Sequence, residues 1–165
     1  MFNEMFPVFH NSTQNLSDPD LAAMATFLLG DQPPQAKVLT TVALDKMTES
    51  AQRGRQSYLN VCAGCHGVEG EGKPHIAVAM QGNTTLRLED PRNLLRVIDD
   101  GIGEQQFSGF ERMQPMPGFA DKLSAQQTTD LINYLRQAWG GQPADLVISQ
   151  IEQLKAEAPP EHKAH

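Results

Sequence analysis

The feature that most constrains this chain is a pentapeptide containing both of its cysteines, Cys62-Ala63-Gly64-Cys65-His66. Cys-x-x-Cys-His is the attachment sequence of a c-type haem. In that chemistry the two thiols add to the haem vinyl groups, and the adjacent histidine supplies one axial ligand to the iron. The pattern therefore predicts one covalent haem c, held by Cys62, Cys65 and His66, around which the chain has to fold.

Other interpretations of the two cysteines are weaker. A disulfide scaffold needs several spaced cysteines. A thioredoxin-like redox pair follows a strand in a βαβ unit, whereas residues 48–61 have a helical pattern. A zinc site needs two further ligands, and only His75 lies near in the sequence. A pair of buried cysteines beside a core histidine would leave the downstream pattern unexplained.

An electron-transfer haem needs a second axial ligand, which is commonly a methionine. Met116 stands between Pro115 and Pro117, which block a regular helix and leave an extended segment that can carry a thioether to the iron. We predict Met116 as the distal ligand, with Met113 as the alternative. His75 lies in a glycine-rich loop, where a solvated side chain is expected.

The spacing of apolar residues predicts helices over residues 48–61, 90–101 and 124–141. The second and third of these carry capping signals at their starts, and glycines mark their ends. An alternating apolar and polar pattern, typical of a half-buried strand, is not seen. We therefore expect an all-α fold in which the haem supplies much of the apolar centre.

The composition bounds the class of partner. The chain has 165 residues and a formal net charge of −7, which argues against nucleic acid as a partner. Its longest apolar run, residues 21–29, is interrupted by Thr26 and is too short for a transmembrane helix.

Three separated signals occur in order along the chain. They are the Cys62 to His66 motif, the Met116-Pro117-Gly118-Phe119 loop and the sequence LINYLR at residues 131–136. In this order they resemble the class I c-type cytochromes, and the resemblance covers residues 43–141. The resemblance implies a class I cytochrome c fold around one haem, with Cys62 and Cys65 as attachment points, His66 as proximal ligand and Met116 as distal ligand.

The same resemblance implies two contacts inside the domain. Gly54 and Tyr58 look like the first-helix positions that cross the terminal helix near Tyr134. The family often has a proline before an apolar residue and Gly-Asn, and its carbonyl receives the N–H of the proximal histidine. Here Ala79 stands where that proline is expected, so its carbonyl is the expected acceptor for His66.

A closer resemblance is to the third haem domain of membrane-associated, three-haem cytochrome subunits of periplasmic alcohol, gluconate or aldehyde dehydrogenases. Residues 12–21 look like the closing helix of a preceding domain, with Met5 where its distal methionine would lie. Residues 1–36 are then an N-terminal helix and linker left from that domain, and residues 37–141 the cytochrome domain. The alternative is that residues 1–36 are only an extra helix and linker. Residues 1–10 show no signal-peptide pattern, so we expect a piece of a longer exported chain.

Residues 142–165 form the last predicted part, an amphipathic segment followed by a disordered tail. Leu146, Ile151 and Leu154 recur in helical register. Such a helix could dock on a partner, lie at a membrane surface or pack back on its own domain. His162 and His165, near the end, are expected to be solvated rather than ligands.

These observations predict a one-electron carrier rather than an enzyme. The resemblance implies that a periplasmic dehydrogenase donates the electrons and that a quinone, cytochrome or oxidase accepts them. It also implies a periplasmic location, free or peripherally attached to the inner membrane. The alternatives are a peroxidase-like haem enzyme and a haem-based gas sensor, both of which need an open or displaceable distal position.

Overall fold

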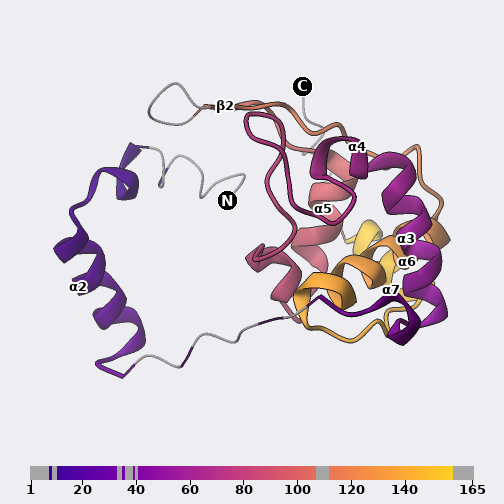
Figure 1. Ribbon diagram of the computed structural model, residues 1–165, viewed down its shortest axis with the longest axis horizontal. Coiled ribbons are helices and arrows are strands. Elements are labelled where there is room, and N and C mark those ends of the chain that lie inside the picture. The colour runs from indigo at the N-terminus through magenta and orange to yellow at the C-terminus, as the bar shows by residue number, and fades with distance from the viewer. Residues whose placement is uncertain are drawn as a thin grey trace. The chain divides into compact units, whose positions relative to one another are not determined.

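The computed structural model describes residues 8, 11–32, 35, 39, 41–106 and 112–157, where regular structure is mainly helical (Figure 1). The chain divides into two compact units, Met1–Val38 and Leu39–His165. In the described part no helix is both long and apolar enough to cross a membrane. Three residues used in the sequence predictions lie outside the described ranges: Met5, His162 and His165.

The first unit contains helix α2 (Asp18–Leu29). Ser17 caps it by accepting a hydrogen bond from the backbone N–H of Asp20, and Gly30 ends it with a positive φ of 79°. No residue of α2 is buried, and Phe27 is 88% exposed. The helix therefore leaves its apolar side chains uncovered within its own unit.

The second unit holds the remaining labelled helices. Their bounds are α3 (Glu49–Val61), α4 (Ala63–His66), α5 (Arg92–Asp100), α6 (Ala125–Leu135) and α7 (Ile148–Ala156). Helix α6 continues as one π-helical turn, Arg136–Gly140, so that the two together span the third predicted helix. These helices confirm the predicted all-α class.

Local capping explains where two of the helices begin. The Thr48 hydroxyl accepts a hydrogen bond from the N–H of Ala51 at the start of α3. Ser124 and Gln127 form a capping box at the start of α6, in which each side chain accepts from the other's backbone N–H. Both starts agree with the sequence prediction because these hydrogen bonds join residues three apart.

Helix α5 begins at Arg92, close to the predicted start, and the carboxylate of Asp90 accepts from the N–H of Arg92 at 2.8 Å. A short antiparallel hairpin that the sequence did not predict follows this helix. Its strands are β1 (Gln105–Gln106) and β2 (Arg112–Met113).

Helices α3 and α6 cross at Gly54. A Cβ atom at this position would overlap the carbonyl oxygen of Asp130, so the crossing requires glycine. Beside it the ring centroids of Tyr58 and Tyr134 lie 5.5 Å apart, which confirms the predicted crossing. Val61, the last residue of α3, is 38% exposed, because the helix ends there and the chain turns into α4.

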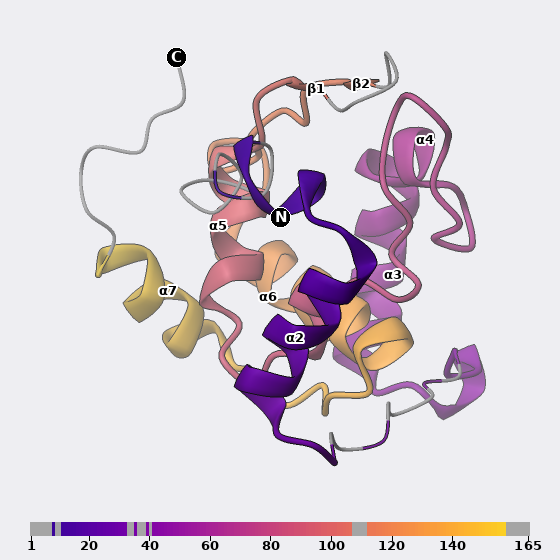
Figure 2. The same ribbon diagram turned by 90° about the vertical axis from the view of Figure 1, so that its left-hand side faces the viewer.

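The core of the second unit lies between α3, α5 and α6, and α7 covers one side of it. Ile151 of α7 is completely buried, and Leu146 and Leu154 pack against the core. The C-terminal amphipathic segment thus packs back on its own unit, beside α5 and α6 (Figure 2). Of the three placements that the sequence left open, this is the one adopted.

Candidate haem site

The haem-attachment motif lies where α3 passes into α4. Cys62 is the C-cap residue that follows α3, and its carbonyl oxygen accepts a hydrogen bond from the N–H of His66 at 2.9 Å. Helix α4 thus brings both thiols and the imidazole onto one turn. Cys62 is half-buried, Cys65 is exposed and His66 is 8% exposed, and both cysteines are free thiols.

The imidazole of His66 is oriented by a backbone carbonyl. Its Nδ1 atom lies 2.9 Å from the carbonyl oxygen of Val78. A carbonyl can only accept, so Nδ1 carries the proton and Nε2 is left as the basic nitrogen. Burial lowers the pKa of His66, although the bond to Val78 opposes that shift. The neutral ring is the form that binds iron.

The expected acceptor for His66, the carbonyl of Ala79, is wrong by one residue. The N–H of Met80 donates to the carbonyl oxygen of Gly70 at 2.8 Å, and the Met80 side chain is buried. With the loop held at Met80, the carbonyl that faces the imidazole is that of Val78. The loop path that decides this depends on Gly70, ten residues away, and is not visible in the sequence pattern.

The thiol chemistry of the pair fits haem attachment better than a redox pair. Burial raises the pKa of Cys62 to about 12, and the proximity of Cys65 adds to the shift. A redox-active Cys-x-x-Cys pair instead has a lowered thiol pKa. The segment before the motif is helix α3, whereas a thioredoxin-like motif follows a strand. Two thiols with one neutral, oriented imidazole are the donor set that a c-type haem requires.

The glycine-rich loop after the motif is tied to the rest of the unit. The Tyr58 hydroxyl donates to the carbonyl oxygen of Gly67 at 2.5 Å, and the ammonium of Lys73 donates to that of Gly64 at 2.6 Å. His75, in the same loop, is exposed and has a positive φ of 60°. Its exposure agrees with the expectation of a solvated loop histidine.

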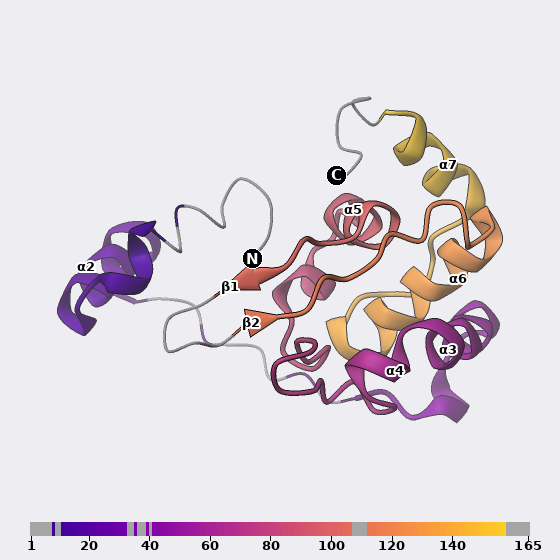
Figure 3. The same ribbon diagram turned by 90° about the horizontal axis from the view of Figure 1, so that it is seen from above.

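Met116 belongs to a second group of contacts, at the C-terminal end of α5. Its N–H donates to the carbonyl oxygen of Ile102 at 2.8 Å, and its own carbonyl oxygen accepts from Ile102 at 2.9 Å. Met116 is partly buried, as is Met113 in strand β2. Figure 3 shows the chain before β1 and after β2 passing close to α5. The extended backbone expected at Met116 is present.

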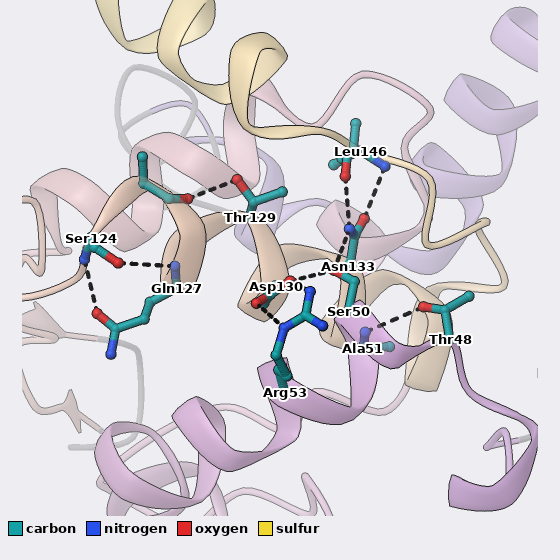
Figure 4. A network of polar contacts seen from close by, with 11 residues as sticks. Thr48, Ser50, Ala51, Arg53, Ser124, Gln127, Thr129, Asp130, Asn133 and Leu146 are labelled. Atoms are coloured by element: carbon teal, nitrogen blue, oxygen red, sulfur yellow. Dashed lines mark hydrogen bonds and ion pairs between the residues drawn. The ribbon is translucent and has the colours of Figure 1, made fainter.

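A polar network, which the sequence analysis missed, joins α3 to α6 (Figure 4). Arg53 pairs with Asp130 at 2.9 Å, and the Ser50 hydroxyl donates to the same carboxylate at 2.5 Å. Burial alone would raise the pKa of Asp130, but the hydrogen bonds from Arg53 and Ser50 hold it below its usual range. The only sequence signal is that the partners lie three residues apart on each helix, at residues 50 and 53 and at 130 and 133.

The same network holds the segment between α6 and α7. Asn133 donates to Ser50 Oγ at 2.9 Å and to the carbonyl oxygen of Leu146 at 2.9 Å. Its amide oxygen accepts from the N–H of Leu146 at 3.1 Å. One buried side chain therefore satisfies both backbone groups of Leu146 and directs the chain into α7.

Comparison with known proteins agrees with this geometry. The cytochrome c family profile matches residues 51–139, which is more than half of the chain. The chain is 32% identical, over 97% of its length, to "Alcohol dehydrogenase (quinone), cytochrome c subunit" of Gluconobacter oxydans. It is 29% identical, over 93%, to "Gluconate 2-dehydrogenase cytochrome c subunit" of Pantoea cypripedii. It spans 35% and 37% of these relatives' own lengths.

Among solved structures, the c-type cytochrome XoxG from Methylobacterium extorquens AM1 covers 66% of this chain and 67% of its own. The sequence identity is 24% and the TM-score is 0.41.

The chain belongs to the cytochrome c family. It is therefore an electron-transfer protein with covalently bound haem c, and not itself a catalytic enzyme.

Proposed function

We propose that this chain carries one haem c, attached through Cys62 and Cys65, with His66 as the proximal ligand and Met116 as the distal ligand. The observation that carries the proposal is the 2.9 Å contact between His66 Nδ1 and the carbonyl oxygen of Val78, beside two free thiols on the same turn. That contact sets the tautomer in which Nε2 is free to bind iron.

When bound, the haem supplies a one-electron ferric–ferrous couple. The residues of this chain set the conditions for that couple. The bond from His66 to Val78 orients the ring and increases its basicity as a ligand. A Met116 thioether bound to the iron would raise the reduction potential and would leave no open site for substrate. This ligand set favours a carrier over a peroxidase-like enzyme or a gas sensor.

We further propose that the electron donor is a periplasmic dehydrogenase and that the acceptor is a quinone, a cytochrome or an oxidase. The support is the similarity to subunits named for alcohol and gluconate dehydrogenases. The corresponding location is the periplasm, free or peripherally attached to the inner membrane. The net charge of −7 favours a partner whose docking surface is positively charged. The rate of association with such a partner should fall as the salt concentration increases.

The three-part organisation is also proposed: residues 1–36 as the remnant of a preceding cytochrome domain, 37–141 as the haem domain and 142–165 as a C-terminal segment. Helix α2 supports this, because it exposes Phe27, Leu28 and Leu29 and buries no residue. Relatives match 93–97% of this chain yet are nearly three times as long. Intact-mass analysis of the native protein tests it. A mature species matching these residues plus one haem would refute the remnant.

The distal ligand is tested by spectroscopy of the haem-loaded protein. Met116→Ala should abolish the ferric thioether-to-iron absorption, lower the midpoint potential and allow carbon monoxide to bind the reduced form. Met113→Ala is the matched control and should leave all three unchanged. If Met113→Ala abolishes the absorption instead, the distal assignment moves to Met113. Rapid carbon monoxide binding by the unmodified protein would show an open or displaceable distal position and would contradict the Met116 assignment.

A further inference from the structure

Three side chains of α5 contact the last turn of α7 and the residue after it. They are four and three residues apart along α5 and therefore lie on one face of that helix. The contacts join Arg92 to the Glu157 carboxylate at 3.1 Å, Arg96 to the carbonyl oxygen of Leu154 at 3.2 Å and Asp99 to Lys155 at 3.1 Å. Figure 2 shows the two helices side by side.

The pair between Asp99 and Lys155 is the most buried of the three contacts. The Asp99 side chain is 6% exposed and that of Lys155 is 27% exposed, whereas the groups joining Arg92 to Glu157 are solvated. Burial raises the pKa of Asp99, and the nearby Lys155 opposes that shift. Because a buried carboxylate without a counter-charge is strongly destabilising, Lys155 is the partner that Asp99 needs.

The backbone of the same part of α5 holds the loop that contains Met116. The carbonyl oxygen of Ile98 accepts from the N–H of Phe119 at 2.9 Å, and that of Asp99 accepts from the N–H of Ala120 at 3.3 Å. Two residues after α5, Ile102 forms the antiparallel bridge with Met116.

The loop also lies too close to α5 to shift without disturbing it. A Cβ atom at Gly101 would overlap the carbonyl oxygen of Met116, and one at Gly118 would lie 2.5 Å from that of Asp99. Asp99 is thus the residue where the two sets of contacts meet. Its side chain pairs with α7, while its backbone carries the Met116 loop.

We propose that Lys155 is a positioning residue for the distal ligand: by pairing with Asp99 it fixes the end of α5 and, through it, the Met116 loop. This rests on the proposed function, in which the Met116 thioether binds the iron. The strength of the bond between the Met116 thioether and the iron is then set partly by α7, a helix that contributes no ligand. Removing the ion pair should let the loop open more often, so that an external ligand replaces Met116 more readily.

The test measures how fast imidazole displaces the distal ligand of the ferric, haem-loaded protein under conditions where every variant is folded. Lys155→Met should increase the rate roughly 2- to 30-fold, the range expected for residues that couple to a site without touching it. It should also weaken the thioether-to-iron absorption. Lys155→Arg keeps the charge and should retain the original rate. Lys46→Met, at an exposed lysine, is the matched control and should have no effect.

A double variant separates positioning from stability. Asp99→Asn with Lys155→Met removes the ion pair without leaving a buried charge, so it should regain much of the lost stability yet still exchange its ligand rapidly. The double variant also takes the place of Lys155→Met in the exchange measurement if that single variant does not fold. An original exchange rate in the double variant would overturn the proposal. If Met116→Ala leaves the thioether absorption intact, the distal assignment itself fails, and this inference fails with it for a separate, identifiable reason.

Discussion

Replacing Asn133 by alanine should release the segment between α6 and α7. The side chain is completely buried and makes three hydrogen bonds, two of them to the backbone of Leu146 and one to Ser50. Each contributes about 1 kcal/mol net, and the backbone groups of Leu146 lose their partner in the variant. We therefore expect Asn133→Ala to lower the free energy of unfolding by about 2–4 kcal/mol.

The assay is denaturant unfolding of the haem-loaded protein, followed by far-UV circular dichroism. The free energy of unfolding and its slope against denaturant concentration are compared between variants. Amide hydrogen exchange at Leu146 should accelerate in the same variant, because its N–H donates to the Asn133 side chain. Asn60→Ala is the matched control. Asn60 is exposed and bonds only to Gln56 in the contacts observed, so its replacement should change stability by less than about 0.5 kcal/mol.

A loss below about 0.5 kcal/mol in Asn133→Ala, with unchanged exchange at Leu146, would refute this reasoning. It would mean that apolar contacts of α7, such as those of Ile151, hold the segment without help from the side-chain amide.

Two further predictions concern the crossing of α3 and α6. Gly54→Ala should destabilise the fold by about 1–3 kcal/mol or more, because the added methyl group overlaps the Asp130 backbone. In the control Gly103→Ala the methyl group meets no atom within 4 Å, so this variant should be nearly neutral in the same unfolding assay. The pKa of Asp130 is lowered on folding, so the stability it contributes is present above its unfolded pKa, near 4, and is lost as the pH falls through the lower folded value. Stability measured from pH 6 down to pH 2 should show this loss, and Asp130→Asn should remove that part of the slope; a slope unchanged in the variant would contradict the assignment.

Where prediction succeeded, the determining interactions are local. The Ser124 capping box joins residues three apart, and the two thiols and His66 lie on one helical turn. The prolines beside Met116 restrict their own backbone and that of the residue before them. Such interactions are specified by neighbouring residues, so the haem motif, the helices and the extended segment at Met116 could all be predicted before any fold was known.

What only the tertiary structure decided depends on contacts between distant segments. The imidazole N–H of His66 donates to the carbonyl oxygen of Val78, because the hydrogen bond between Met80 and Gly70 fixes the path of the loop. Helix α7 packs on its own unit because Asn133 holds the segment before it and side chains of α5 bind its last turn, although its amphipathic pattern fits a partner or a membrane equally well. Periodicity shows that a face will be buried but not what will cover it. That choice is made by shape and hydrogen bonding between residues far apart in the chain.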